Sequence, residues 1–465
     1  MIRIDKRLTP KSLLPAVDRM FDLSGRKVAL IEKSWNPAHG TPVFTVRGRY
    51  TSRGWTEWTQ GFQFGSAILQ YDATGDPAML EIGRKATVDL MASHVSHVGV
   101  HDHGFNNVST YGNLLRLARE GRIEASDWEV RFYELALKVS GAVQAARWTE
   151  LPEGLGYIHS FNGPHSLFAD TMRSLRSLAV GHRLGHVLMG ERDRKISLLG
   201  RLIQHADTNA RFIVYFGKGR DAYDVRGRVV HEAIFNLKDG SYRCPSTQQG
   251  YSPFSTWTRG LAWVITGYAE ELEFLETLAP QEFEAHGGKK AVLRRYLDAA
   301  RATADFYLAH TPTCGVPYWD TGAPGLAHLD DYLDRPADPF NDHEPVDSSA
   351  AAITAQGLIR LGLYLGAEDR RPGPTATASE GERYLKAGLT VARTLLDEPY
   401  LSTSRTHQGL LLHAVYHRPN GWDHIPRGRA IPCGESCMWG DYHLRELGLL
   451  IRRMALKQPY YTFFA

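Results

Sequence analysis

Apolar side chains recur at intervals of three and four residues from about residue 60 onward, which is the period of an amphipathic helix. Residues 290–310 show the pattern, because Val292, Tyr296 and Ala300 fall on one helical face. The same period occurs in the segments 78–95, 128–146, 166–185, 350–366 and 381–396. We count roughly twelve such segments, so the share of residues in helices would be well above that of a typical globular chain. The pattern therefore predicts an all-α fold.

The helical segments differ in sequence, and no clear linker divides them. They favour six helical hairpins closed into a ring within one domain, residues 1–465, although periodicity alone does not establish the closure. Two long non-helical stretches, 217–256 and 311–346, are candidates for lining a site. Asp239 and Gly240 in the first of them indicate the turn of a small β-hairpin.

Composition and charge exclude several classes of partner. The 465 residues carry a formal net charge of +3, which is too balanced for a nucleic-acid or anionic-membrane surface. Charges interrupt every apolar run in residues 1–30, and no later run approaches the length of a membrane span. Of the four cysteines, Cys433 and Cys437 form a C-x-x-x-C pair with no histidine partner at zinc-ligand spacing. We expect a reduced cytoplasmic protein that is a monomer or homodimer, with no membrane or nucleic-acid partner.

Residues 168–181, FADTMRSLRSLAVG, contain the first candidate for chemistry. As a helix, this segment would place Asp170, Arg173, Ser174 and Ser177 in one polar stripe. The stripe is either a solvated face with an Asp170–Arg173 ion pair or, if the helix lines a barrel interior, a cavity wall with an acid at its mouth.

Residues 246–275 contain the second candidate, because Arg259 and Trp263 share a helical face at a spacing of four. A guanidinium fork beside an indole suits a sugar carboxylate, since the fork binds both oxygens while the ring stacks on the pyranose. A core tryptophan shielded by a neighbouring arginine is the alternative interpretation.

Seven motifs together resemble one enzyme family. In chain order they are WTQGF (58–62), HDHGF (101–105), STQQGYSPFSTWTRGLAWVITGY (246–268), GVPYWDTGAP (315–324), VDSSAAAITAQGLIRL (346–361), GLLLHAVYHRPNG (409–421) and ESCMWGDYHLREL (435–447). Their order and content resemble the unsaturated glucuronyl hydrolases of glycoside hydrolase family 88, with the unsaturated rhamnogalacturonyl hydrolases of family 105 as cousins. The resemblance implies an (α/α)6 barrel of six helical hairpins.

The resemblance also implies an unusual reaction, which needs no metal or cofactor. Enzymes of this family remove the non-reducing Δ4,5-unsaturated uronic acid that polysaccharide lyases leave on oligosaccharides. An aspartic acid protonates C4 of the enol ether and water adds at C5, so the usual two-carboxylate displacement at the anomeric carbon is not used. The hemiketal that results rearranges and releases the aglycone.

The resemblance assigns roles to individual residues. Asp170 takes the role of the family's acid and base, and Asp102 that of its second essential aspartate. The substrate-binding positions matched by the motifs are Trp58, His231, Gln249, Arg259 and Trp263.

Protonation of an enol carbon requires a carboxyl group that keeps its proton near neutral pH. Burial among aromatic walls and the like charge of Asp102 are expected to raise the pKa of Asp170 accordingly. Arg173 opposes this expectation, because a cation one helical turn from Asp170 would lower that pKa unless it points away.

The histidine-rich stretch HVSHVGVHDHGF (94–105) raises the question of a metal site. His94, His97 and His101 share a spacing that would suit ligands on one helical face. No His-Glu-x-x-His partner motif is present, so we expect packed or hydrogen-bonded histidines and no metal.

Two rival functions stay open at this point. Sugar epimerases also use (α/α)6 barrels, and His231 with His413 or His417 would imitate their acid–base pair. A non-catalytic oligosaccharide-binding relative is the other alternative. Retention of both Asp102 and Asp170 counts against it.

Overall fold

The computed structural model describes residues 1–54, 57–368 and 378–465. Its α-helices are α1 (Pro10–Ser34), α2 (Gln60–Thr74), α3 (Pro77–Leu90), α4 (Ala92–Val95), α5 (His103–Asn107), α6 (Asn113–Arg119), α7 (Asp127–Ala146), α8 (Thr171–Ser174), α9 (Arg176–Arg183), α10 (Leu198–Phe212), α11 (Thr258–Glu276), α12 (Lys289–Ala309), α13 (Ser348–Glu368), α14 (Ala378–Leu395) and α15 (Met438–Ala455). The strands are β1 (Phe44–Val46), β2 (Arg49–Thr51), β3 (Trp148–Glu150), β4 (Gly156–Ile158), β5 (Ser166–Phe168), β6 (Val187–Met189), β7 (Lys195–Ser197), β8 (Glu232–Phe235) and β9 (Tyr242–Ser246). The chain is mostly helical, as its periodicity predicts.

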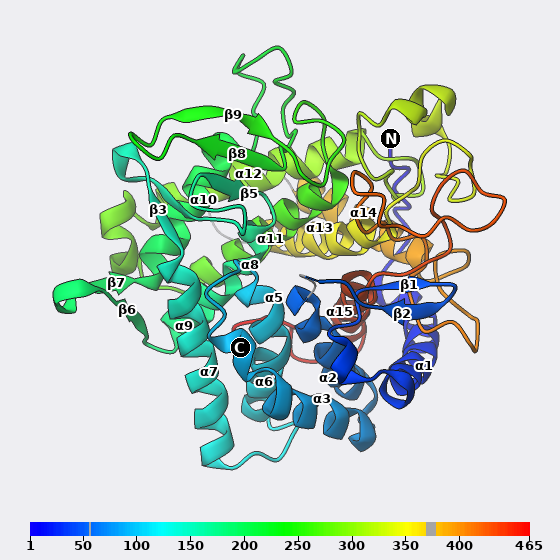
Figure 1. Ribbon diagram of the computed structural model, residues 1–465, viewed down its shortest axis with the longest axis horizontal. Helices are drawn as coiled ribbons and strands as arrows, with labels where there is room; N and C mark the ends of the chain where they lie inside the picture. The colour runs from blue at the N-terminus through cyan, green and yellow to red at the C-terminus, as the bar shows by residue number, and fades with distance from the viewer. Residues whose placement is uncertain (55–56, 369–377) are drawn as a thin grey trace.

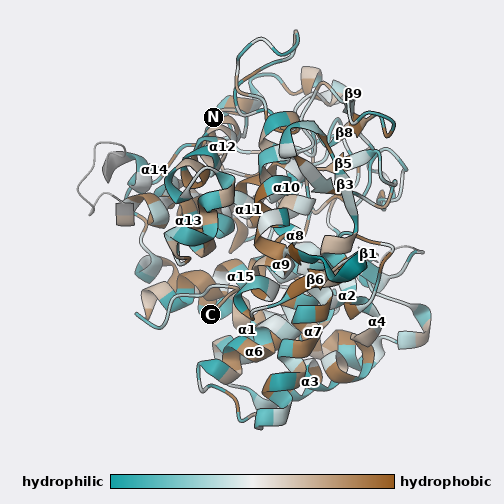
Figure 2. Ribbon diagram, turned by 90° about the vertical axis from the view of Figure 1, so that its left-hand side faces the viewer, coloured by the Kyte–Doolittle hydropathy of each residue, from teal (hydrophilic) through white to brown (hydrophobic). Residues whose placement is uncertain are grey.

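The helices pack in two layers (Figure 1). Within the described residues, the inner layer runs from α2 through α15, α13 and α11 to α8 and α9, and α5 connects these last two back to α2. Each inner helix has an outer neighbour: α3 packs on α2, α1 on α15, α14 on α13, α12 on α11, α7 on α5 and α9, and α10 on α8 and α9. The outer helix α7 carries both polar and apolar residues, as amphipathic packing requires (Figure 2).

Local signals fix the ends of several helices. Ser126 and Glu129 form a capping box at the start of α7, and Asp76 caps α3 ahead of a proline in the first turn. In the predicted segment 290–310, Val292, Tyr296 and Ala300 are all buried, which confirms its apolar face.

Helix α13 corrects one expectation. Residues 348–367 are long and apolar enough to cross a membrane by length and composition, although the sequence was expected to hold no such run. The protein itself buries 83% of this window. A helix that is apolar on all sides is also what the interior of a large helical protein requires.

Short strands lie where the long connections meet the inner helices. Strands β5, β8 and β9 form a three-stranded antiparallel sheet, and the turn between β8 and β9 contains Asp239 and Gly240, as predicted. Gly240 has φ +72°, a value that favours glycine. The predicted helix 166–185 is partly wrong, because residues 166–168 form strand β5 and the helical part begins at Thr171. Pairing with β8 overrides the local helical pattern there.

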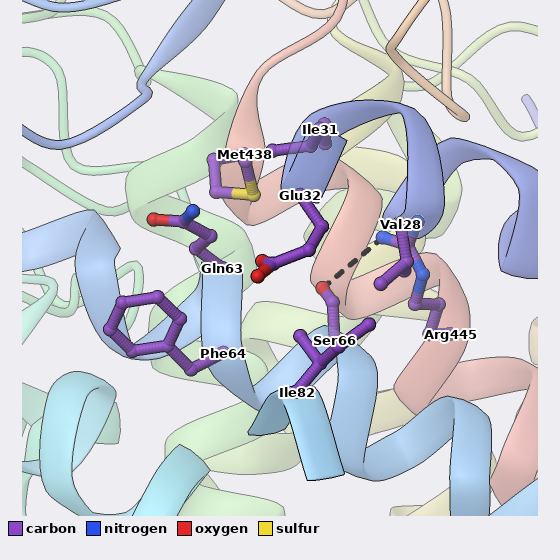
Figure 3. A pocket seen from close by; sticks show the side chains of 9 residues that line it. All are labelled: Val28, Ile31, Glu32, Gln63, Phe64, Ser66, Ile82, Met438 and Arg445. Atoms are coloured by element: carbon purple, nitrogen blue, oxygen red, sulfur yellow. Dashed lines mark hydrogen bonds between the residues drawn. The ribbon is translucent and has the colours of Figure 1, made fainter. Parts of the chain in front are cut away.

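A small cavity lies between α1, α2 and α15. It has a volume of about 20 Å³, and Val28, Gln63, Ser66 and Arg445 are among the residues that line it (Figure 3). Arg445 donates a hydrogen bond to Ser66 Oγ at its edge, with a donor–acceptor distance of 3.2 Å. The volume suits a single water molecule and is too small for a sugar ring.

Candidate active site

Two carboxylates far apart in the sequence come together where two inner helices begin. Asp102 immediately precedes α5, and Asp170 immediately precedes α8. Gly104 lets these helices touch, because a Cβ atom there would collide with the carbonyl oxygen of Ser174. The amide of Gly104 also donates to Ser174 Oγ at 3.0 Å. The HDHGF motif therefore supplies both an acid and the close contact that positions it.

His101 lies between the two carboxylates. Its Nε2 is 3.3 Å from Asp170 Oδ1 and 3.8 Å from Asp102 Oδ1. Asp102 is 7% exposed and Asp170 8%, whereas His101 is 1% exposed. Sequence reasoning missed His101 as part of the site. Its position immediately before Asp102 in the HDHGF motif could have indicated this role.

The three groups shift one another's pKa values. Burial raises the pKa of Asp102, and the charge of Asp170 adds to this against the opposing effect of His101. The pKa of Asp170 is lowered: burial raises it, but the charge of His101 and its hydrogen bond outweigh the burial. The pKa of His101 is raised because its carboxylate neighbours outweigh burial. The expectation that Asp170 itself has the raised pKa is therefore wrong; in the trio formed by Asp102, His101 and Asp170, the pKa values of Asp102 and His101 are the ones that are raised.

Arg173 does not pair with Asp170. Its guanidinium is fully buried and binds Glu270 through Nε and Nη2, at 3.0 and 2.9 Å, and Glu446 through Nη2 at 2.7 Å. The predicted polar stripe therefore faces the protein interior, and the solvated ion pair is wrong. Because these two glutamates compensate its charge, Arg173 is not the cation that lowers the pKa of Asp170.

His231 lies beside Asp170 on the segment that enters β8. Its backbone carbonyl accepts a hydrogen bond from Ala169 at 2.9 Å, which fixes it next to the acid. Its Nδ1 accepts from the backbone N–H of Gln248 at 2.9 Å, so Nε2 carries the proton of the neutral ring. Burial lowers the pKa of His231 to about 4. His231 is therefore a neutral donor beside Asp170.

Arg259 is engaged with the protein itself. Its Nη1 donates to Asp347 at 3.0 Å and to the carbonyl of Val415, and its Nη2 donates to Gln249 Oε1 at 3.2 Å and to the carbonyl of Tyr416 at 2.7 Å. The guanidinium is 2% exposed, whereas Gln249 is half-buried. The structure thus places the Gln249 amide, held by Arg259, nearer to solvent than the fork expected to bind a carboxylate.

The indoles that flank Arg259 are Trp257 and Trp439, with the guanidinium carbon 4.7 and 4.8 Å from the two ring centroids. Trp263, the expected partner, packs elsewhere, with its ring 4.9 Å from that of Phe105 and 5.0 Å from that of His443. Sequence reasoning missed Trp257 and Trp439 as site residues, although both lie inside the quoted motifs.

Trp58 joins the same set of rings, because it stacks on Trp439 with 4.9 Å between ring centroids. At the other end of the set, the rings of Trp257 and Phe168 lie 4.9 and 4.4 Å from that of His231. A band of aromatic and cationic side chains therefore runs from the predicted binding residue Trp58 to the carboxylates.

Two other histidines of the 94–105 stretch form hydrogen bonds within the protein. His94 hydrogen-bonds Gln60 and Asn106, and His103 hydrogen-bonds Ser140 and the carbonyl of His97. Among the residues that the structure describes, no group of three or more His, Cys, Asp or Glu side chains is placed to hold a metal ion.

Curated proteins and solved structures resemble this chain over most of its length. No family model matches the chain. Curated relatives named unsaturated glucuronyl hydrolase occur in Formosa agariphila, with 25% identity over 84% of this chain and 78% of the relative, and in Bacillus sp. strain GL1, with 26% identity over 87% and 89%. An unsaturated chondroitin disaccharide hydrolase of Streptococcus agalactiae is 25% identical over 84% of this chain and 80% of its own.

Solved structures show the same fold. The unsaturated glucuronyl hydrolase of Bacillus sp. GL1 matches with a TM-score of 0.68 and 22% identity, covering 94% of this chain and 96% of that one. An unsaturated glucuronyl hydrolase specific for heparin matches with a TM-score of 0.68 and 18% identity over 96% and 100%. The curated relatives indicate a glycosidase, and the solved structures show its helical fold. Within that class, the chain is similar to unsaturated glucuronyl hydrolases over most of its length, which confirms the resemblance carried by its motifs.

Proposed function

We propose that this protein removes a Δ4,5-unsaturated uronic acid from the non-reducing end of lyase-generated oligosaccharides by hydrating the C4=C5 enol ether. The main support is the arrangement of Asp102, His101 and Asp170, in which two buried carboxylates face one imidazole nitrogen beside a band of aromatic side chains. A Streptococcus agalactiae relative, 18% identical to this chain, has been solved with dGlcA-GalNAc6S bound. A chain with this trio is suited to the same class of sugar.

Asp170 acts as acid and then as base. In its protonated form it gives a proton to C4 while a water oxygen forms a bond to C5, and the carboxylate then takes the proton that the water loses. The net change is the addition of H and OH across the double bond. Two neighbours of Asp170 orient the sugar. They are Asp102, whose pKa is raised, and His231, whose neutral ring can donate a hydrogen bond.

The remaining predicted residues form the sugar-binding walls. The half-buried Trp58 offers a stacking surface and is backed by the fully buried Trp439, and the half-buried Gln249 amide offers donors for the uronate carboxylate. Arg259 sets the position of Gln249 and adds positive charge behind it. Trp263 packs on Phe105, whose ring lies 6.3 Å from that of Trp58.

We also propose the finer architecture, localisation and assembly. The two helical layers support an (α/α)6 barrel, and one buried apolar cluster extends from Ile2 to Phe464, as in a single domain. The expected reducing compartment is consistent with four free cysteines, and the protein is proposed to act as a monomer or homodimer in the cytoplasm.

Loss of the ultraviolet absorbance of the C4=C5 chromophore tests the proposed activity. The panel consists of unsaturated disaccharides made by lyases from several polysaccharides, with wild type and Asp170→Asn measured side by side. Decay with wild type and none with the variant is the expected result. An unchanged absorbance on every member refutes the proposal and directs attention to the epimerase and binding alternatives.

A further inference from the structure

Two aromatic rings and two backbone hydrogen bonds hold His101 between the two carboxylates, and its buried Nδ1 has no hydrogen-bond partner in the described residues. Phe161 stacks on its ring with 5.9 Å between centroids, and Phe168 meets its edge at 5.6 Å. Its backbone carbonyl accepts hydrogen bonds from Gln144 Nε2 at 2.7 Å and Ser174 Oγ at 2.6 Å. The imidazole therefore keeps Nε2 directed at Asp170, the geometry that a proton transfer between the two requires.

The charges around His101 favour a proton on its ring. The carboxylates of Asp102 and Asp170 face Nε2, while the nearest cation, Arg147, is turned to the carbonyls of Val98, His159 and Ser160. Three further histidines surround the trio, and burial lowers their pKa values, to about 4 for His159, about 3 for His205 and about 4 for His231. They are neutral at pH 7, so among the four histidines His101 is the one whose surroundings favour a proton on the ring.

We propose that His101 is a positioning residue that stores the proton which Asp170 delivers to the substrate. The inference rests on the proposed function and deepens it. When the sugar covers the site, the Nε2–H bond of His101 breaks as an O–H bond forms at Asp170 Oδ1. Asp170 then protonates C4, recovers a proton from the attacking water, and returns it to His101 after product release. Each cycle consumes one water, and the trio ends with the proton it began with.

The first test reads the proton directly and needs no substrate. Carbon-13-labelled histidine lets NMR follow the ring of His101, identified by the signal missing from His101→Gln. We expect a titration midpoint above the free-histidine value of about 6.5, and a midpoint lower by about one pH unit or more in Asp170→Asn. A midpoint below that of free histidine, or one that does not move in Asp170→Asn, overturns the inference.

The second test follows kcat/KM against pH on the best unsaturated disaccharide. In His101→Gln the basic limb moves to lower pH by about one unit or more, while KM stays within about threefold, because a carboxyl pair without imidazole loses its proton more readily. The matched control is His103→Gln, also 1% exposed but bonded to Ser140 and the carbonyl of His97. Its basic limb is expected to stay in place.

The NMR titration and the pH profile together distinguish failure of the His101 role from failure of the proposed function. A uniform loss of activity in His101→Gln without a shift of the limb, or an equal shift in His103→Gln, overturns the role of His101. If the wild type turns over no unsaturated sugar, the proposed function fails, and the NMR titration still decides whether His101 stores the proton.

Discussion

Replacement of Arg173 by methionine tests whether this arginine serves the fold or the acid. The change removes a fully buried charge while keeping an unbranched apolar side chain of similar length. Glu270 then loses two hydrogen bonds and Glu446 loses one, and Arg176 remains 3.9 Å from Glu270 and 3.6 Å from Glu446. Removing one partner of a buried ion pair costs about 3–5 kcal/mol because the remaining charge stays desolvated. Since Arg176 retains part of the compensation, we expect a loss at the lower end of that range.

Urea unfolding at pH 7 measures this loss, and Arg173→Met/Glu446→Gln provides the matched control. The double variant removes one of the two carboxylates together with the cation, so it should recover part of the stability that the single variant loses. Turnover by the folded Arg173→Met protein, measured well below its unfolding temperature, should retain the pH dependence of the wild type. A stable Arg173→Met protein with a shifted pH profile would refute the reasoning, because it would show that Arg173 acts on Asp170.

The remaining predictions concern the binding wall, the buried histidines and metals. Trp58→Ala should raise KM up to roughly tenfold, about 1.4 kcal/mol of lost stacking, with a smaller change in kcat; an unchanged KM would remove Trp58 from the site. Because burial lowers the pKa of His205 from 6.5 to about 3, the unfolded state binds its proton first, and stability falls as the pH drops below about 6.5. His205→Gln should reduce this acid slope in urea unfolding by up to about 1.4 kcal/mol per pH unit, and an unchanged slope would contradict the assignment. Excess EDTA should leave turnover unchanged, whereas a loss restored by Zn²⁺ would reveal a metal requirement.

The sequence predicts the helices well, because the spacing of apolar residues along a segment indicates which of its faces is buried. Val292, Tyr296 and Ala300 are buried as expected. Periodicity fails at Phe168. This residue fits a helical face in the sequence, but it lies in β5 and pairs with Glu232 of β8. Such pairing depends on a segment more than sixty residues away, which a local pattern does not contain.

The site shows the same division. The motifs identify Asp102 and Asp170, and the structure brings both to His101. The direction of each pKa could not be predicted, because it depends on which neighbour faces which oxygen. Arg173, one turn from Asp170 in sequence, is bound to Glu270 and Glu446, which lie on α11 and α15. The short separation of Arg173 and Asp170 in the sequence therefore did not indicate which carboxylates Arg173 binds.

Reaction in D2O tests the central claim most directly. The wild type is given its best unsaturated disaccharide in D2O, and the released sugar is followed by NMR from the first turnovers. Hydration predicts one deuteron at C4, in a single stereochemical position, together with loss of the vinyl signal at the rate of aglycone release. Release of the aglycone with the C4=C5 double bond intact and no deuterium at C4 would contradict the account, because it would mean cleavage at the anomeric carbon.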